Sequence, residues 1–241
     1  MDAALIHKST PLNDEPAQIV ARYARRNQIS SELWTPVSPA VCMMRQEKER
    51  AVLRWIRECG ITPLAPKRLL EVGCGSGANL LDFIRIGFLP ENLVGNDLLP
   101  ERVRSARAQL PDSLKVIEGN ALELQFPTAS FDVVSQSTVF TSILDDMFQE
   151  KLAREMWRWA IPGGGVLWYD FIYNNPRNPD VRGVPLSRIR HLFPDGYLRY
   201  WRVTLAPPIS RIVTRIHPTF YTLVNFVWLF RTHVLCWIEK H

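Results

Sequence analysis

The sequence predicts an α/β fold in which a mostly parallel sheet carries helices on both faces. From residue 67 onward, short apolar runs alternate with helical segments, as they do in strand–helix–strand units. A glycine-rich turn at 73–77 follows the first of these runs, at the end of a strand where parallel sheets bind ligands. The 241 residues and a hydrophobic content of 46% are enough for one large core.

An N-terminal arm precedes this alternation. Residues 1–35 are polar and show no sustained periodicity, so we interpret them as an arm that orders on something else. Tyr23 with Arg25 and Arg26 forms a basic and aromatic cluster in this arm, which makes it a candidate lid over a binding site.

A helix follows Pro39, because apolar residues recur at helical spacing and Gly60 is a typical helix stop. The residues of this apolar face are Met44, Ala51, Val52, Trp55 and Ile56. We expect the helix to pack on the main domain. The predicted organisation is an N-terminal arm and helix over 1–60 and a main domain over 61–241, with a helical insert at 207–231.

The alternating part of the chain gives five strands and three helices. The predicted strands occupy residues 68–72, 93–96, 114–118, 131–136 and 166–171. The predicted helices occupy residues 79–88, 101–110 and 147–159. We expect the run Pro162–Gly165 to break the chain before the fifth strand.

Two further strands are predicted in the tail. Trp201, Val203 and Leu205 alternate with polar residues, as a half-exposed strand would, and residues 232–239 form the second strand. The insert between them is aromatic and roughly helical. It either caps a binding pocket or packs as ordinary core.

Charge is concentrated in the last third of the chain. Residues 171–241 hold nine Arg and one Lys against three acidic residues, a net charge of +7, so the first 170 residues carry −2. Arginine suits carboxylates and phosphates, and this excess indicates a solvated basic face, an acidic substrate or an anionic membrane surface.

Cysteine spacing and hydropathy limit the class of protein. The four cysteines form no C-x-x-C pair, so neither a zinc site nor a disulfide framework is indicated. No basic-then-apolar signal opens the sequence, and the longest apolar stretch, 220–230, is too short to span a bilayer. We expect a cytoplasmic protein, with peripheral contact at the inner membrane face through the basic C-terminal third.

The glycine turn predicts a nucleotide-like cofactor. Glycines let backbone amides approach a ligand, and the positive end of the following helix favours it. By itself the turn is ambiguous, because Gly73, Gly75 and Ala78 also satisfy the dinucleotide fingerprint of oxidoreductases.

Further polar residues favour an adenosylmethionine site. Glu71 precedes the first glycine by two residues, near the place of a cationic methionyl group, and Asp97 ends the second strand, where it can accept hydrogen bonds from ribose hydroxyls. Asn120 follows the third strand, at the level of an adenine ring. These residues follow one another along the chain together with Phe131–Val134 and the 162–165 turn. In this order of motifs the sequence resembles the class I methyltransferase family, particularly its UbiE-like "type 11" branch.

The resemblance covers residues 67–171 and, more loosely, the tail. It implies a Rossmann-like, seven-stranded fold with an antiparallel last strand, S-adenosylmethionine as cofactor, S-adenosylhomocysteine as product, and no metal. Asn120 departs from the pattern, since many members have aspartate there. The implied cofactor contacts are Glu71, Gly73, Cys74, Gly75, Gly77, Asp97, Leu98, Asn120, Ala121, Leu122 and Gln136.

Methylation of a hydroxyl benefits from a nearby base. Asp170 is the first candidate, because the fifth strand delivers it, with Tyr173, to the ligand-binding end of the sheet. The loop 174–180 would lie beside the pocket, either carrying specificity or serving as a connection. The other candidate bases are Asp145, Asp146, His191 and His217. The two aspartates also fit the N-cap of the helix that begins at residue 147.

The acceptor is predicted only as a class. The tail, with Arg231-Thr232-His233, resembles methyltransferases of glycan assembly, which implies a sugar hydroxyl on a phosphate-bearing or lipid-linked intermediate; a small molecule is the broader expectation. Three alternatives stay open: an NAD(P)-dependent oxidoreductase, an RNA methyltransferase, and a cofactor-binding protein without activity. No nucleic-acid module supports the second, so a nucleic-acid partner is not expected.

Overall fold

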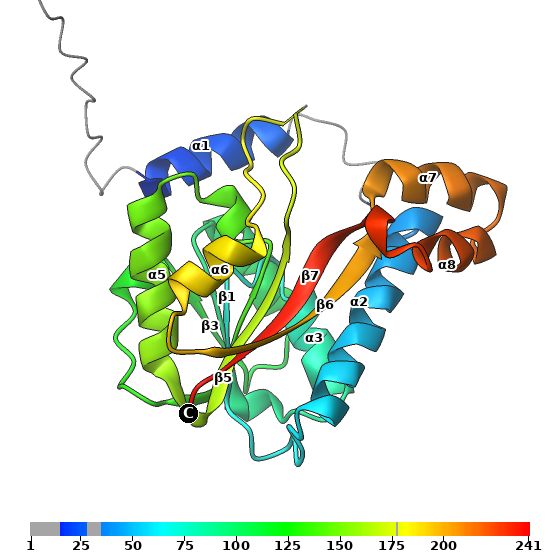
Figure 1. Cartoon of the computed structure of the whole chain (residues 1–241). Helices are drawn as coiled ribbons and strands as arrows, with labels where there is room; N and C mark the ends of the chain where they lie inside the picture. The colour runs from blue at the N-terminus through cyan, green and yellow to red at the C-terminus, as the bar shows by residue number, and fades with distance from the viewer. Residues whose placement is uncertain (1–14, 28–34, 177) are drawn as a thin grey trace, which may run out of the picture.

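The computed structural model describes residues 15–27, 35–176 and 178–241. One seven-stranded sheet forms its centre (Figure 1). Its order is β3 (Lys115–Glu118), β2 (Leu93–Asp97), β1 (Leu69–Val72), β4 (Phe131–Ser137), β5 (Ala160–Phe171), β7 (Arg231–Glu239) and β6 (Tyr197–Leu205). The first five strands pair in parallel and β7 is antiparallel to both of its neighbours, which confirms the predicted sheet with its antiparallel last strand.

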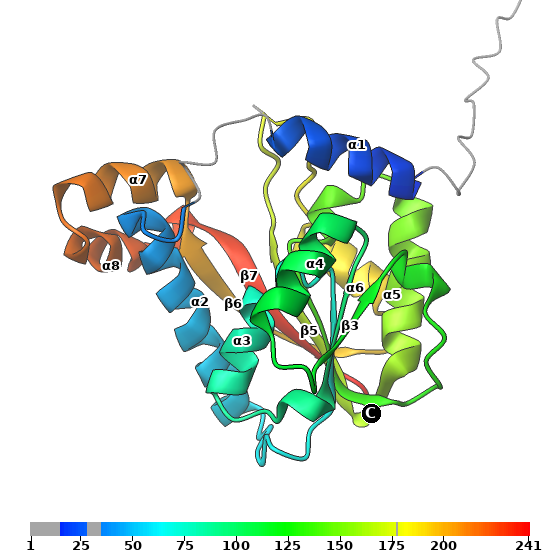
Figure 2. The same cartoon turned by 180° about the vertical axis from the view of Figure 1, so that it is seen from behind.

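Helices cover both faces of this sheet, as predicted (Figures 1 and 2). One face carries α2 (Pro39–Glu58), α3 (Ala78–Arg85) and α4 (Pro100–Gln109), and the other carries α5 (Asp146–Trp159) and α6 (Leu186–Leu192). The helix α1 (Glu15–Asn27) lies across the carboxyl ends of the parallel strands, and α7 (Pro207–Ile216) and α8 (Thr219–Asn225) project beside β6. Short 3-10 turns are η2 (Pro90–Asn92), η3 (Ala121–Glu123), η4 (Phe140–Ser142) and η5 (Trp228–Phe230).

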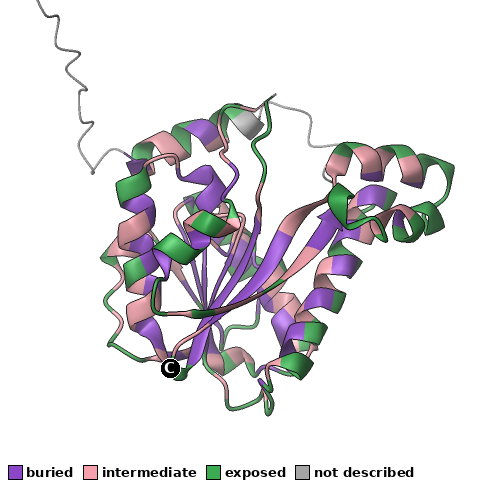
Figure 3. Cartoon of the chain, viewed as in Figure 1, coloured by how far each residue is buried: buried purple, intermediate pink, exposed green. Residues whose placement is uncertain are grey.

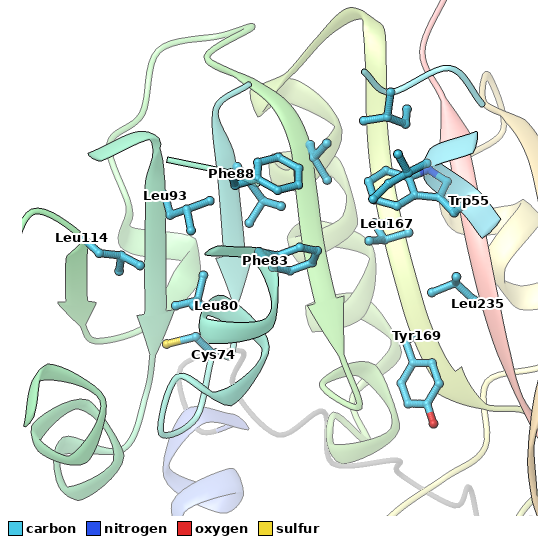
Figure 4. Packing of buried hydrophobic residues seen from close by; sticks show 14 of the residues in the cluster. Trp55, Cys74, Leu80, Phe83, Phe88, Leu93, Leu114, Leu167, Tyr169 and Leu235 are labelled. Carbon is cyan, nitrogen blue, oxygen red and sulfur yellow. The ribbon is translucent and has the colours of Figure 1, made fainter. Parts of the chain in front are cut away.

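The α2 helix shares its core with the sheet. Its Trp55 is fully buried and packs on Trp237 of β7, with 5.2 Å between ring centroids. Leu80 and Phe83 of α3 extend the same cluster across the sheet (Figure 4). The expectation that the N-terminal helix packs on the main domain is therefore met, while the boundary drawn at residue 60 stays a prediction.

Local sequence explains how α5 begins and how closely α3 packs on the sheet. Asp145 caps α5, since its side chain accepts a 2.7 Å hydrogen bond from the amide of Phe148. Gly95 of β2 lets α3 approach closely, because a Cβ there would lie 2.8 Å from Leu80 and 2.9 Å from the sulfur of Cys74. The cap at Asp145 and the glycine at position 95 thus help to place α5 and α3 against the sheet that positions the site.

The predicted break before the fifth strand is wrong. The strand begins at Ala160, and the run Pro162–Gly165 lies within it, at a register shift against β4. Glycine is needed there for close approach, since a Cβ on Gly164 would lie 2.4 Å from the carbonyl oxygen of Asp132. The glycines bring backbones together and do not end the strand. The helices α1 and α6 were not predicted.

Burial separates the sheet from one exposed projection (Figure 3). The strands are mostly buried, whereas α7, α8 and the turn after them expose most of their surface. Within the described residues, no helix combines the length and apolar character needed to cross a bilayer.

Candidate functional site

The glycine turn holds a conformation that larger residues could not adopt. Gly73 and Gly77 have positive φ angles of 66° and 88°. A Cβ on Gly73 would lie 2.4 Å from Cγ2 of Val139, and one on Gly77 would lie 2.7 Å from Cδ1 of Leu110. The turn therefore requires glycine for its backbone conformation and for its packing. It places backbone without side chains at the carboxyl end of β1.

Asp97 fixes this turn from the neighbouring strand. Its carboxylate is buried and accepts hydrogen bonds from the amides of Gly75 at 2.8 Å and Leu99 at 2.9 Å. A carboxylate oxygen has a second lone-pair direction, so each oxygen can still accept a bond from a ligand hydroxyl. This placement agrees with the predicted role of Asp97 toward a ribose.

A small cavity of about 110 Å³ lies at the carboxyl ends of β1, β2 and β4. Five predicted cofactor residues line it together: Gly73, Asp97, Leu98, Asn120 and Ala121. Leu122 lies behind them, partly buried in the core, and its amide donates to Oδ1 of Asn120. Residues distant in the sequence thus form one concave site.

A large cavity of about 380 Å³ adjoins the small one. It lies between α2, α3 and the ends of β4, β5 and β7, and most of its lining is apolar. The predicted cofactor residue Gln136 lines it, and Ser137 and Thr138 line both cavities. The two spaces therefore meet at the end of β4. Thr138 has φ of 58°, an unusual angle for a residue with a side chain and one that is common at functional turns.

A buried network of charged and polar groups crosses the wall of the large cavity. Nδ2 of Asn79 donates to Oε1 of Glu71 at 2.6 Å, and Nζ of Lys48 donates to Oδ1 of Asn79 and Oγ of Ser137, both at 2.8 Å. Burial raises the pKa of Glu71 and lowers the pKa of Lys48, and the attraction between the two charges opposes both shifts.

One oxygen of this network lacks a partner. Oε2 of Glu71 is buried without a hydrogen bond to any described residue. A buried carboxylate oxygen left in this way is costly, so a bound group with hydrogen-bond donors would satisfy it. An ammonium group, such as that of a methionyl moiety, fits this requirement and agrees with the prediction for Glu71.

Tyr169 and His233 form the far wall of the large cavity. Their rings stack with centroids 5.2 Å apart, and the Tyr169 hydroxyl shares a 2.7 Å hydrogen bond with Oγ1 of Thr204. Nδ1 of His233 lies 3.0 Å from Oγ1 of Thr232. Burial, with the charge of Lys48, lowers the pKa of His233 to about 4, so its ring is neutral near pH 7.

Asp170 lies away from both cavities. Its side chain is fully buried and accepts hydrogen bonds from the amides of Thr141 and Phe171. Burial raises its pKa to about 7, and those hydrogen bonds oppose the shift. Asp170 points to the α5 face because strand neighbours alternate, whereas Tyr169 points to the cavity. This position gives Asp170 no access to an acceptor, so the geometry does not support it as the base.

The other candidate bases also lie outside the two cavities. Asp145 caps α5, Asp146 pairs with Arg182, and His191 is 3.5 Å from Glu150. His217 is exposed and accepts from the amide of Thr219, and Tyr173 is exposed. The cap interpretation of Asp145 is confirmed.

Cys74 has a structural position. Its side chain is buried, and its amide donates to the carbonyl of Asn96 at 2.8 Å. Burial raises the pKa of its thiol, so the thiolate that a nucleophile requires is disfavoured.

The α1 helix covers the small cavity and is held by buried polar contacts. Arg22 pairs with Glu15 at 2.5 Å and donates to the carbonyl of Ser142, and Glu15 accepts from the amide of Leu144. Tyr23 lines the cavity, and its hydroxyl lies 3.2 Å from Oγ of Ser142. The candidate lid thus lies over the site, although its movement stays a prediction. Of its two predicted arginines, Arg25 pairs with Asp180, and the side chain of Arg26 is outside the described ones.

Sequence reasoning missed the polar residues of the large cavity. Lys48 and Tyr169 belong to no motif, and His233 was named only as part of the run 231–233, without a role in the site; all three line the large cavity. One signal was available for Lys48, since it falls four residues after Met44 on the helix face assigned to packing. No group of three or more metal-binding side chains occurs among the described residues.

Comparison with known proteins shows what part of this chain is similar to. Residues 70–168 match the model of a family described as "Methyltransferase domain". The chain is 30% identical over 152 residues to a demethylmenaquinone methyltransferase of Deinococcus radiodurans, covering 61% of each chain. It is 29% identical over 110 residues to the ubiquinone/menaquinone biosynthesis C-methyltransferase UbiE of Vibrio vulnificus, covering 44% of this chain and 41% of that one. The alignments thus span less than two thirds of these relatives.

A solved structure shares the fold. The YcgJ protein of Bacillus subtilis superposes with a TM-score of 0.57 and 17% identity, covering 80% of this chain and 99% of that chain. The order of the sheet is that of a Rossmann-like fold, which the chain shares with this structure. Residues 70–168 are thus similar to methyltransferase domains, and the relatives they resemble include UbiE-like proteins.

Proposed function

We propose that the protein transfers a methyl group from S-adenosylmethionine to a hydroxyl oxygen of a small molecule held in the large cavity. The observation that carries this proposal is the meeting of the two cavities at Ser137 and Thr138. A cofactor held at the small cavity would have its reactive end beside the large one. When bound, S-adenosylmethionine supplies an electrophilic methyl group on a sulfonium.

The residues that would hold the cofactor have the required chemistry. Asp97 offers carboxylate oxygens for two ribose hydroxyls, and the unpartnered oxygen of Glu71 offers an acceptor for the methionyl ammonium. Lys48 offers a cationic donor for the methionyl carboxylate at the same wall. The positive end of α3 and the bare amides of the glycine turn add to this site.

His233 is the residue that we assign to the acceptor. Methyl transfer to oxygen requires alignment of the hydroxyl and loss of its proton. The ring of His233 is neutral and lines the large cavity, so it can accept a hydrogen bond from that hydroxyl. Stacking on Tyr169 holds the ring in place.

The lining of the large cavity favours an apolar acceptor. Most of the surface that it exposes is apolar, and Met44, Val52, Phe83, Leu167 and Leu235 are among the residues that line it. A hydroxylated ring compound or a lipid-linked sugar suits this wall better than a free sugar, since polar groups without partners are costly to bury. The glycan acceptor implied by the tail therefore stays within the proposal in its lipid-linked form.

A quinone acceptor methylated at carbon is the second candidate. The two relatives above carry quinone methyltransferase names, and the same apolar wall suits a quinone ring. Carbon and oxygen products differ in their NMR spectra, so product analysis separates the two candidates.

The test is methyl transfer from S-adenosylmethionine with a tritiated methyl group. The acceptors are a prenylated demethylquinol, a simple phenol, a lipid-linked sugar and the free sugar. We expect labelled O-methyl products from the apolar hydroxyl compounds, and about 100-fold lower kcat/KM for His233→Leu with unchanged affinity for S-adenosylhomocysteine. Label on ring carbon would establish the second candidate instead. Transfer to the free sugar alone would contradict the apolar acceptor.

A further inference from the structure

The segment 207–230 exposes many large apolar side chains, while two of its small polar side chains are buried. We name it the apolar hairpin; it comprises α7, α8 and η5. In α7 the inward residues are Ser210 and Thr214, which are 0% and 6% exposed, whereas Ile212 and Ile216 face outward at 62% and 73%. Only Ile209 and Val213 of α7 pack inward, so the helix leaves a second apolar stripe exposed that an isolated surface helix would not need.

The second half of the hairpin repeats this arrangement. Tyr221 is its buried residue, and the outward side chains continue without interruption through η5. Seven large apolar side chains are between 41% and 79% exposed: Phe220, Leu223, Phe226, Val227, Trp228, Leu229 and Phe230. With the two isoleucines, nine large apolar residues are exposed within 19 positions. Monomers rarely expose contiguous apolar surface of this extent, so a binding partner is indicated.

Buried polar contacts hold the hairpin in this orientation. The hydroxyl of Tyr221 donates to Oε2 of Glu47 and accepts a 3.2 Å hydrogen bond from the amide of Leu205. Nδ2 of Asn225 donates to the other oxygen of Glu47 at 2.7 Å. These contacts join α8 to α2 and β6, so the apolar residues face outward in a fixed structure.

Charge indicates what the surface binds. Between Asp195 and Glu239 the sequence has no acidic residue, and it has five arginines there. Arg211 and Arg215 each precede one of the exposed isoleucines of α7. Anionic lipid headgroups attract such arginines by about 1 kcal/mol each near the surface, and Trp and Phe side chains favour the headgroup region. A second copy of the hairpin would oppose arginine with arginine, which is unfavourable.

The hairpin also forms part of the rim of the large cavity. Pro207, its first residue, lines the cavity together with Thr204 of β6 and with Val41 and Met44 of α2. Ile209 and Val213 of α7 pack with Met44 and Leu205 in one cluster. In Figure 1 the hairpin and α1 stand at the same end of the sheet. A surface attached there would lie next to the cavity that holds the acceptor.

We propose that the apolar hairpin docks on an anionic lipid bilayer and that the large cavity takes its acceptor from that bilayer. The docking proposal rests only on the exposed apolar side chains and the arginines of the hairpin. The delivery of the acceptor from the bilayer also rests on the proposed function. Partition of an apolar acceptor into the same bilayer would raise its concentration at the cavity rim.

The test of docking is sedimentation of the full chain with vesicles of phosphatidylcholine, alone or mixed with phosphatidylglycerol. We expect binding to the mixed vesicles that weakens with salt. Phe226→Ser with Leu229→Ser should abolish it, and Arg215→Gln should weaken it about fivefold, the equivalent of 1 kcal/mol. The matched controls are Met147→Ser and Arg104→Gln, exposed residues of other helices, which should bind as the unaltered chain does.

Two results would overturn docking. One is a chain that stays in solution with mixed vesicles at low salt; the other is binding that survives the Phe226 and Leu229 substitutions. A concentration-dependent dimer in analytical ultracentrifugation, lost in that double variant without vesicle binding, would assign the surface to a second copy. Titration of each variant with S-adenosylhomocysteine controls for folding. Vesicle binding without methyl transfer would refute the proposed function and leave docking intact.

Discussion

The carboxylate of Asp97 accepts a 2.8 Å hydrogen bond from the amide of Gly75, so the second strand of the sheet holds the turn that follows the first. One side chain therefore shapes the turn and faces the small cavity. We therefore expect cofactor binding to depend on this contact.

Substitution of Asp97 tests that dependence. Asp97→Asn removes the charge that strengthens its hydrogen bonds, and we expect affinity for S-adenosylhomocysteine to fall about 10- to 100-fold, from bonds worth about 1.5–3 kcal/mol. Isothermal titration calorimetry measures this change. The matched control is Asp112→Asn, an exposed aspartate, which should leave affinity unchanged. Equal affinity in both variants would contradict the assignment.

Alanine at two glycines separates strain from packing. Gly73 and Gly75 both have positive φ, but only at Gly73 would a Cβ meet another residue, Val139, at 2.4 Å. We expect Gly75→Ala to cost about 1–2 kcal/mol of unfolding free energy from the left-handed backbone alone. Gly73→Ala should cost more. Urea denaturation without cofactor gives both values, and adding Val139→Ala should recover part of the Gly73→Ala loss. Equal costs for the two glycines would argue against the close packing.

The stability of the protein depends on pH through Asp170. Burial raises its pKa from an ordinary 3.8 to about 7, so the native state binds this proton more tightly than the unfolded state. The resulting stabilisation is complete below pH 4 and is lost as pH rises through 7. Relative to Asp170→Asn, the unaltered chain should lose on the order of a few kcal/mol between pH 4 and 7.

Denaturation of both proteins across this pH range measures the difference, in which the other titrating groups cancel. Parallel stability curves would show that Asp170 does not titrate in this window. Because Asp170 lines neither cavity, we also expect Asp170→Asn to keep kcat at a pH where it is folded. A large loss of kcat would restore Asp170 as the base.

Arg22 and Glu15 form a buried ion pair in α1, the helix that covers the small cavity. Both side chains are under 10% exposed, and removal of one partner from a buried pair is strongly destabilising. We expect Arg22→Gln to speed hydrogen exchange at the amides of α1 and the dissociation of S-adenosylhomocysteine. Arg25→Gln breaks an exposed pair with Asp180 and serves as the control, since such pairs contribute at most about 1 kcal/mol. Unchanged exchange in Arg22→Gln would mean that other contacts hold the helix.

The sequence predicted most of the fold because its strands and helices have clear periodicity. Apolar runs ended within one or two residues of the observed strands β1 to β4, and the glycine turn located the ligand end of the sheet. The fifth strand was misjudged because glycines that serve close backbone approach, such as Gly164 and Gly165, are identical in sequence to glycines that end a strand. The α1 helix was missed because tertiary contacts of Arg22 and Glu15 hold a polar segment.

The site was predictable only where backbone conformation dictates the residue. Glycines at positive φ and an acid at a strand end leave a pattern, so the residues of the small cavity could be named in advance. Lys48 and His233 come from elements 185 positions apart, and only the assembled sheet brings both to one cavity. Asp170 and Tyr169 are neighbours in sequence, yet alternation along β5 sends them to opposite faces, and the prediction chose the one that does not line the large cavity.

Calorimetric titration with S-adenosylmethionine, S-adenosylhomocysteine and NADH, side by side, tests the central claim most directly. The glycine turn alone is compatible with both cofactor classes, whereas Glu71 offers an unpartnered oxygen to the amino-acid ammonium group that only the first two ligands carry. We predict binding of the first two ligands and none of NADH. Binding of NADH alone would contradict the account and make the protein an oxidoreductase on the same fold.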